Sequence, residues 1–269
     1  GTIPDFYLLD NVTRFSDYSF PIGKGLSGEV VTDLKRVPHF LIAGETGTGK
    51  SSFIRMMIET LLLRNELLEV YFLDFKGAIE AEPFRGHSKV HIISEFFEAA
   101  KIVKQLNEKL TTRNKDLAGV AYNIENFNKK QKDASKKWSR ILIVVDEISE
   151  IIPRLGSGKS EELQEINRGI NRIARMGRAS GLHLVVGTQK PDAKNLDPTI
   201  KANLPGIVCF AVTHPSQSMV VLGDGRAADL NVAFEGRAIW KHGRFVEEIQ
   251  TPFLSQEDLD KAKEEDLKT

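Results

Sequence analysis

The residues with the clearest chemistry form a glycine-rich stretch from Gly44 to Ser51, with the sequence GETGTGKS. Glycines at this spacing let the backbone curl so that successive N–H groups point at phosphate oxygens, and a helix that follows adds partial positive charge. Lys50 would reach the terminal phosphates of a nucleoside triphosphate, and the Ser51 hydroxyl would take a position on Mg²⁺. The residues expected to contact the nucleotide are Gly44, Glu45, Thr46, Gly47, Thr48, Gly49, Lys50, Ser51 and Ser52.

The segments on either side are those that such a loop needs. The apolar run 39–43 before it predicts a buried strand, and residues 52–63 after it predict a helix. An ordinary turn rich in glycine and threonine would not require this strand and helix. The chain is therefore predicted to bind a nucleoside triphosphate.

A second candidate group is the acidic pair Asp146 and Glu147, which ends the aliphatic strand predicted over 141–145. In a nucleotide hydrolase with parallel strands, the carboxyl end of a neighbouring strand delivers acids to the phosphates. Asp146 would hold Mg²⁺ through its water shell, and Glu147 would polarise the attacking water. The alternative is a helix N-cap followed by a solvated acid.

Two further segments carry candidate residues. Gln189 follows the strand predicted over 182–187 and would place an amide near the γ-phosphate, unless the segment is only a turn before Pro191. The helix predicted over 160–180 has an apolar stripe that packs on the sheet, and arginines on its other side. These arginines form either a solvated basic face or a surface for another subunit or nucleic acid, including an arginine supplied to a neighbour's nucleotide. The arginines are Arg168, Arg172 and Arg175, with Arg178 at the helix end.

The order of the predicted elements defines the fold class. Further strands are expected over 69–74, 90–93 and 206–212, a helix from an N-cap at Ser94 to about 115, a surface excursion over 119–140 and a closing hairpin over 237–249. Strands that alternate with helices predict an α/β fold with a mainly parallel sheet covered on both faces. We expect a strand-rich lead-in over 1–38, a core over 39–254, and a charged tail over 255–269 that is an exposed helix or disordered.

The composition sets limits on the kind of protein. With 269 residues, 41% hydrophobic and 28% charged, the sequence is that of a soluble globular protein without an apolar run long enough to span a bilayer. The formal net charge is zero, so any contact with nucleic acid must come from local patches. The single cysteine, Cys209, lies in an apolar run and is expected in the core, which fits a reducing cytoplasm.

Several segments of the sequence together resemble those of a known family, the FtsK/SpoIIIE-type motor ATPases of the HerA–FtsK group. The similarity runs from about residue 20 to 248. It rests on the lead-in over 22–44, Leu73-Asp-Phe-Lys76, Val144-Val-Asp-Glu147, the segment from Arg178 to Pro191, and Ile200-Lys-Ala-Asn-Leu-Pro205.

The resemblance implies a RecA-like core that binds ATP and Mg²⁺ and works as a hexameric ring, with ATP between subunits and DNA drawn through a central pore. It implies that Gln189 senses the γ-phosphate and that an arginine acts in trans, with Arg113, Arg175 and Arg178 as candidates. It also implies a cytoplasmic domain of a bacterial protein, with membrane-associated transfer or secretion machinery as a partner and a membrane anchor outside this segment as one expectation.

Two functions from different classes follow from the resemblance. The first is a DNA translocase, most simply a conjugative-transfer coupling ATPase, because no winged-helix DNA-reading domain is visible in the sequence. The second is a protein-secretion motor of the type VII kind. The segment Asp74-Phe-Lys-Gly77 resembles the second-strand motif of those motors at least as well. A nucleotide-binding switch is disfavoured, because a switch needs no water-activating acid such as Glu147.

Overall fold

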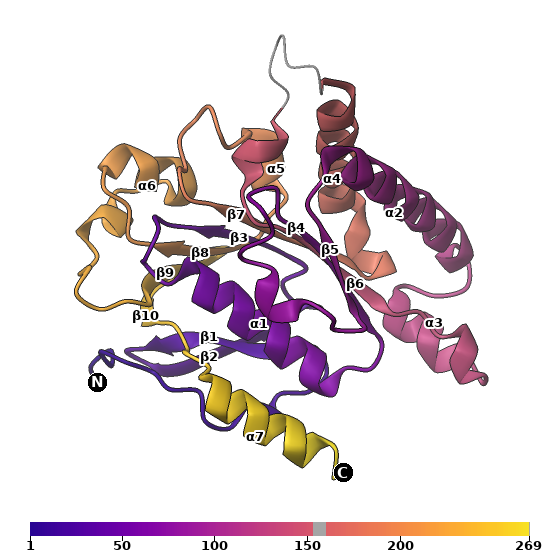
Figure 1. Ribbon diagram of the computed structural model, residues 1–269, viewed down its shortest axis with the longest axis horizontal. Coiled ribbons are helices and arrows are strands. Elements are labelled where there is room, and N and C mark those ends of the chain that lie inside the picture. The colour runs from indigo at the N-terminus through magenta and orange to yellow at the C-terminus, as the bar shows by residue number, and fades with distance from the viewer. Residues whose placement is uncertain (153–159, 269) are drawn as a thin grey trace. The chain divides into compact units, whose positions relative to one another are not determined.

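The computed structural model describes residues 1–152 and 160–268 (Figure 1). The chain divides into two compact units, one formed by Gly1–Glu66 with Gly187–Thr269 and the other by Leu67–Val186. In the part of the chain that is described, every helix is too short or too polar to cross a membrane.

The unit Leu67–Val186 is built on parallel strands. These are β4 (Leu68–Leu73), β5 (Val90–Ile93), β6 (Arg140–Val145) and β7 (Leu182–Thr188), whose last two residues belong to the other unit. They lie in the order β7-β6-β4-β5, with Val145 beside both Leu73 and Val186. Every residue of β6 is buried, as expected for a central parallel strand.

Helices α2 (Phe96–Leu117) and α4 (Ser160–Ser180) of this unit pack side by side (Figure 1). A Cβ at Gly169 of α4 would lie 2.2 Å from Cγ1 of Val103, so glycine permits this close approach. The predicted apolar stripe of α4 is confirmed as buried: Leu163, Ile166, Ile170 and Ile173. The predicted N-cap at Ser94 is wrong, because the extended residue Glu95 is the N-cap and leaves Ser94 one position too early to bind the first turn.

The surface excursion over 119–140 contains a helix that the sequence analysis did not predict. Helix α3 (Ile124–Lys130) is capped by Asn123, whose side chain accepts a hydrogen bond from Asn126 N at 2.9 Å. Short 3-10 turns complete the unit: η2 (Glu82–Phe84), η3 (Ala134–Lys136) and η4 (Ile148–Ile151).

The other unit contains a mixed set of strands in the order β2-β1-β10-β9-β8-β3. Its core pair, β3 (His39–Ala43) and β8 (Gly206–Phe210), is parallel, and Cys209 of β8 is buried as predicted. The remaining strands are antiparallel: β1 (Ser19–Gly25), β2 (Gly28–Asp33), β9 (Arg237–His242) and β10 (Phe245–Gln250). The predicted closing hairpin is therefore confirmed as β9–β10.

The helices of this unit are α1 (Lys50–Arg64), α5 (Pro198–Ala202), α6 (Pro215–Leu222) and α7 (Gln256–Asp266), with the 3-10 turns η1 (Val12–Arg14) and η5 (Arg226–Asp229). Taken with the parallel strands of Leu67–Val186, they confirm the predicted α/β class with a β lead-in and a closing hairpin.

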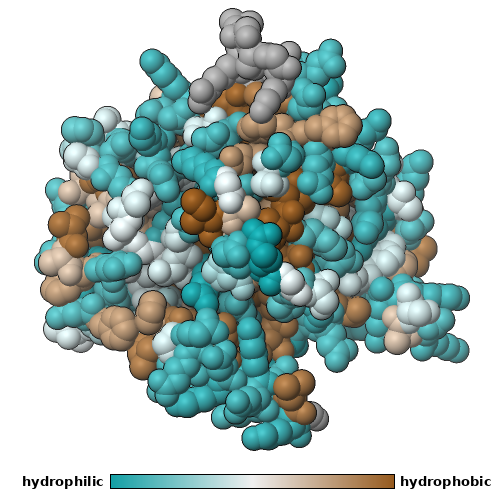
Figure 2. All heavy atoms as spheres, viewed as in Figure 1, coloured by the Kyte–Doolittle hydropathy of each residue, from teal (hydrophilic) through white to brown (hydrophobic). Residues whose placement is uncertain are grey.

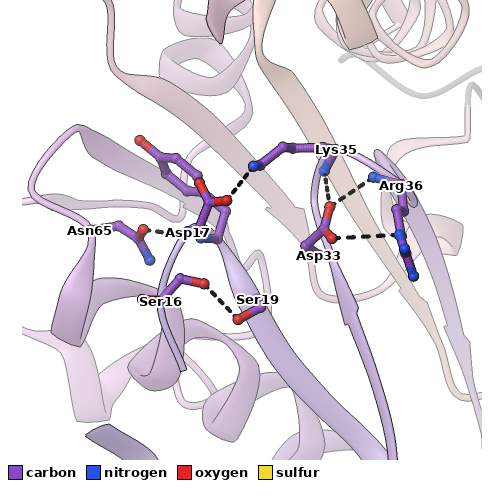
Figure 3. Close-up of polar contacts among 8 residues, drawn as sticks. Ser16, Asp17, Ser19, Asp33, Lys35, Arg36 and Asn65 are labelled. Carbon is purple, nitrogen blue, oxygen red and sulfur yellow. Dashed lines mark hydrogen bonds and ion pairs between the residues drawn. The ribbon is translucent and has the colours of Figure 1, made fainter. Parts of the chain in front are cut away.

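The lead-in packs on the core through β1, which pairs with β10 at Lys24 and Gln250. Figure 3 shows how polar contacts fix its turns: Tyr18 N donates to Oδ1 of Asn65 at the end of α1 (3.1 Å), and Lys35 pairs with Asp17. The division into residues 1–38, 39–254 and 255–269 stays a prediction.

The charged tail forms helix α7, which confirms the helical alternative over disorder. It is not simply exposed, because Leu259 and Ala262 are buried and Lys263 pairs with Glu59 of α1 at 3.7 Å. The outward face is hydrophilic, as the lower part of Figure 2 shows. This inward face is not predicted from the sequence, because only two small or apolar residues mark it among many charges.

Candidate functional site

The loop Gly44–Ser51 has the backbone that the glycines were expected to provide. Gly44, Gly47 and Gly49 have φ values of 153°, 81° and 115°, which side-chain-bearing residues rarely adopt. A Cβ at Gly44 would lie 2.5 Å from Cβ of Phe210, and one at Gly49 would lie 2.9 Å from Cα of Gly236. Glycine is thus required at both positions for conformation and for space.

Residues distant in sequence hold the loop in this shape. Glu45 Oε1 accepts hydrogen bonds from Thr213 N (3.0 Å) and Thr213 Oγ1 (2.5 Å). Thr48 Oγ1 donates to Glu45 O (2.6 Å), and Gly236 N donates to Thr48 O (2.9 Å). The Glu45 carboxylate therefore ties the loop to Thr213, in the segment after β8. Thr213 and Gly236 could not be predicted as loop partners, because no spacing in the sequence connects them with the loop.

Helix α1 begins at Lys50, two residues earlier than predicted, so its first turn is part of the loop. Its N-cap, Gly49, has no side chain to satisfy the first helical N–H groups, and the first intrahelical bond runs from Phe53 N to Gly49 O (2.9 Å). The backbone N–H groups of a helix start are well suited to phosphate oxygens. Lys50 is buried, and Ser51 and Ser52 are half-buried beside it.

The end of β7 reaches this loop. Gly44 N donates a hydrogen bond to Thr188 O at 3.1 Å, which places the buried Thr188 beside the first residue of the loop. Gln189 is the next residue and is half-buried. The structure thus brings the segment of Gln189 to the candidate phosphate site, although its role as a sensor stays a prediction.

In the unit Leu67–Val186, Asp146 and Glu147 follow the end of β6 and are both only 4% exposed. Asp146 N donates to Leu73 O at 3.1 Å, and Glu147 Oε1 accepts from Ser149 N at 3.3 Å as the N-cap of η4. The capping part of the alternative interpretation is therefore present, but the acid is not solvated. A buried carboxylate that caps a short helix with one oxygen has its orientation fixed.

A third acid lies at the end of the neighbouring strand β4. Asp74 is buried, and its carboxylate accepts from Lys76 N (3.1 Å), Glu80 N (2.9 Å) and Ala81 N (3.3 Å). These bonds close the turn after β4, so the geometry gives Asp74 a structural role.

The hydroxyl of Ser51 and the carboxylate of Asp146 are both oxygen ligands of the type that Mg²⁺ prefers.

The arginines divide into two groups. Arg168, Arg175 and Arg178 are exposed on α4. The prediction of a solvated or interacting face is wrong for Arg172, which donates to Asn107 O (3.0 Å) and Thr111 Oγ1 (2.9 Å) of α2. Its side chain therefore connects α4 to α2.

Arg113 is not suited to act in trans, which corrects its place among the candidates. Its guanidinium is buried, donates to Ser180 O (2.8 Å) and Ser139 O (3.0 Å), and lies over the ring of Trp138. Burial lowers the pKa of Arg113 to about 10. Arg113 therefore joins α2 to the end of α4 and the start of β6, leaving Arg175 and Arg178 as the exposed candidates.

Known proteins of similar sequence share most of this chain. It is 34% identical over 214 residues to the DNA translocase FtsK of Campylobacter jejuni, covering 77% of this chain and 22% of that protein. It is 32% identical over 255 residues to the DNA translocase FtsK of Clostridium tetani, covering 90% of this chain and 33% of that protein. The chain thus spans about a third or less of the length of these relatives.

Solved structures have the same fold. The pCW3 conjugation coupling protein TcpA, in a monomer form with ATPγS, matches with a TM-score of 0.88 and 30% identity over 99% of this chain and 75% of that one. The type VII secretion ATPase EccC of Thermomonospora curvata matches with a TM-score of 0.74 over 93% of this chain and 31% of that one, and at 23% identity it shows the fold alone. A model of the FtsK/SpoIIIE family covers residues 12–193, more than half of the chain. The chain belongs to the FtsK/SpoIIIE family.

Proposed function

We propose that this chain is the ATP-hydrolysing motor domain of a DNA translocase, of the conjugative coupling kind. The observation that carries the proposal is the loop Gly44–Ser51, with three glycines at positive φ, in a chain of the FtsK/SpoIIIE family. The identity of about a third to DNA translocases, and of 30% to a conjugation coupling protein with ATPγS, supports DNA as the substrate.

Each candidate residue has a role in this proposal. Backbone N–H groups in the stretch Gly44–Ser52, other than those of Gly44, Glu45 and Thr48, which donate to protein carbonyls, bind the phosphates together with the Lys50 ammonium. Ser51 and Asp146 hold Mg²⁺, which neutralises charge on the phosphates when bound. Glu147 orients and deprotonates the attacking water, while Gln189 senses the γ-phosphate from the end of β7. The Glu147 carboxylate supports the assignment because it is buried and accepts a hydrogen bond from Ser149 N, which fixes its orientation at the end of β6.

Assembly follows from the same proposal. The motor would be a hexameric ring with ATP at subunit interfaces, where Arg175 or Arg178 of one subunit approaches the nucleotide of the next. Both arginines are exposed on α4, as a residue that acts on a neighbour must be. The full-length protein would place this domain in the bacterial cytoplasm, next to membrane-associated transfer machinery.

The test is the ATPase rate with and without DNA at increasing salt concentration. We expect DNA to stimulate hydrolysis and the stimulation to fall steeply as salt rises, because each phosphate contact releases counterions. Comparison of single- and double-stranded DNA identifies the preferred substrate. The control is the Lys50→Ala variant, which should lose hydrolysis with every DNA.

A different result would favour the other class of motor. If DNA left the rate unchanged at every salt concentration while a secreted substrate peptide raised it, DNA translocation would be refuted. The chain would then be a protein-secretion motor of the type VII kind.

A further inference from the structure

The segment between α2 and β6 carries a dense group of positive charges. Its residues 119–137 contain five lysines and two acids, which gives a local formal charge of +3 in a chain whose formal net charge is zero. The five lysines are all exposed: Lys129, Lys130, Lys132, Lys136 and Lys137. The proposed ATPase chemistry uses none of them, so their concentration in one segment calls for another explanation.

A groove of about 670 Å³ opens in the same segment, and its lining includes Val120, Tyr122, Asn126, Lys129 and Lys130. Tyr122 is 92% exposed. Lys130 Nζ donates to Val120 O, and because an ammonium has three donors this bond leaves others for a phosphate. Proteins bind single-stranded nucleic acid with this combination: bases stack on an exposed aromatic ring while cations contact the phosphates.

Hydrogen bonds and ring stacking fix the backbone that carries the groove. Asn128 of α3 and Trp138 exchange two bonds, from Asn128 Nδ2 to Trp138 O (2.9 Å) and from Trp138 N to Asn128 Oδ1 (2.8 Å). The rings of Phe127 and Trp138 stack with their centroids 3.7 Å apart. The backbone of α3 is therefore in position before a ligand binds, which lowers the entropy cost of binding.

The groove lies at the other end of β6 from the candidate catalytic acids. Trp138 comes just before the start of β6 at Arg140, whereas Asp146 and Glu147 follow its end at Val145. Figure 1 shows α3 next to the start of this strand. At about 3.3 Å per residue, the 6 residues of β6 separate its two ends by roughly 20 Å, so the groove is separate from these acids.

A single strand suits these features better than a duplex or a membrane surface does. In a duplex the bases stack on one another, which leaves no base face for Tyr122, whereas a single strand can turn its bases toward a ring. A membrane-binding helix exposes an apolar face beside its lysines. The two apolar residues of α3 already have partners within the unit, because Ile124 is buried and Phe127 stacks on Trp138.

We infer that the groove at α3 binds single-stranded DNA, with Tyr122 stacked on a base and with Lys129 and Lys130 on neighbouring phosphates. The inference rests on the proposed DNA translocase function, and it adds a DNA contact outside the ATPase site. The remaining three lysines extend the positive surface beyond the groove.

The test is the Kd for a short fluorescent oligothymidylate, measured by anisotropy without nucleotide for the parental chain, Tyr122→Ala and the double variant Lys129→Gln, Lys130→Gln. Tyr122→Ala should raise this Kd by about 5- to 30-fold, because one base loses its stacking partner, and should change the Kd for a duplex of the same length much less. The double variant should lower the slope of log Kd against log salt concentration by about 0.7 for each lysine that contacts a phosphate.

The matched controls lie on α2 of the same unit. Phe97→Ala removes an aromatic side chain that is 75% exposed, and the double variant Lys101→Gln, Lys104→Gln removes the same charge from exposed positions. Both controls should bind the oligonucleotide like the parental chain. The rate of ATP hydrolysis without DNA should stay at the parental value in all four variants.

An unchanged Kd for the single strand in both α3 variants, while DNA still stimulates hydrolysis by the parental chain, would overturn the inference and leave the proposed function standing. So would an equal loss for single strand and duplex in Tyr122→Ala, because stacking would then play no part. If the α3 variants instead lost binding to vesicles with phosphatidylserine or to polyglutamate alone, the groove would be a membrane or acidic-peptide surface. A parental chain that neither binds DNA nor responds to it would overturn the proposed function itself.

Discussion

At the scale of single residues, Glu147 illustrates how one side chain meets structural and chemical demands together. Its Oε1 caps η4 through Ser149 N, and the whole side chain is nearly inaccessible to solvent. A carboxylate that only capped a helix would gain little from such burial, since a charge out of water carries a desolvation cost. Its burial and fixed orientation at a strand end are consistent with the role in water activation that we propose.

Glu147→Gln separates the two demands. The amide oxygen of glutamine can still accept from Ser149 N, so the melting temperature and the Kd for ATP should stay close to the parental values. The turnover rate should fall by about 10²–10⁴-fold, because the base that takes the proton from water is lost. Steady-state ATPase assays and nucleotide titration measure the two effects, with Glu150→Gln, a half-buried acid of the same 3-10 turn, as the control. Turnover at the parental rate would show that Glu147 is only a cap.

At the scale of elements, two arginine side chains that are buried or half-buried connect helices α2 and α4. Arg113 of α2 binds the last residue of α4 and the residue before β6, and Arg172 of α4 binds α2 in return. The apolar stripe of α4 is buried, and the absence of a side chain at Gly169 allows α4 to pack closely on α2. The α2–α4 pair is thus joined at its polar edge as well as in its apolar centre.

Arg113→Ala should lower the free energy of unfolding by about 2–4 kcal/mol, because the carbonyls of Ser180 and Ser139 lose a charged donor in a buried place. Urea denaturation measures the change. Arg168→Ala is the matched control, since Arg168 lies exposed on α4 and its pair with Glu165 is an exposed i,i+3 contact. An unfolding free energy within about 0.5 kcal/mol of the parental value, the range of ordinary surface substitutions, would contradict the structural role given to Arg113.

Glu59 gives a pH-dependent prediction for the contact between α1 and α7. Burial raises the pKa of Glu59 above its ordinary value of 4.5, although Lys263 opposes the shift. The folded state therefore binds the proton more tightly than the unfolded chain, so this group favours folding most below pH 4.5 and loses that effect as the pH rises through the raised value. Glu59→Gln should raise the unfolding midpoint at pH 7 and change it less at pH 4.

Urea denaturation at both pH values tests this prediction, with Glu264→Gln on the exposed side of α7 as the control. A midpoint that fell at pH 7 would show that the ion pair with Lys263 outweighs the cost of burying the charge.

At the scale of the whole molecule, the exposed arginines of α4 matter only if subunits assemble. Arg175 and Arg178 lie on the surface, and a side chain that acts on a neighbour's nucleotide must reach it across an interface. An arginine supplied in trans to a transferring phosphoryl group is worth about 10³–10⁵ in rate in other nucleotide hydrolases. The effect of removing it should therefore depend on the composition of the ring.

Mixing two inactive variants tests this directly. Arg175→Ala or Arg178→Ala subunits keep the phosphate loop, whereas Lys50→Ala subunits keep the arginines. If one of the arginines acts in trans, mixed rings should regain hydrolysis that neither variant shows alone, as measured by ATPase assay over a series of mixing ratios. Arg168→Ala should stay active by itself. Loss of activity in proportion to the variant fraction, with no recovery at any ratio, would exclude action across the interface.

The parts of this protein that follow from its amino-acid sequence are those in which residues near one another carry the signal. The glycine spacing in 44–51, the aliphatic strand before Asp146 and the alternation of strands with helices are local patterns, and steric limits on the backbone and burial of apolar side chains translate them directly into structure. Other features depend on contacts between residues that are distant in sequence and are visible only in the folded chain. Thr213 and Gly236 bond to the loop, Arg113 is buried and not exposed, and the ring of Phe6 contacts that of Phe253. Such contacts leave no trace in spacing, because the pairing of strands such as β1 with β10 brings together residues more than 200 positions apart.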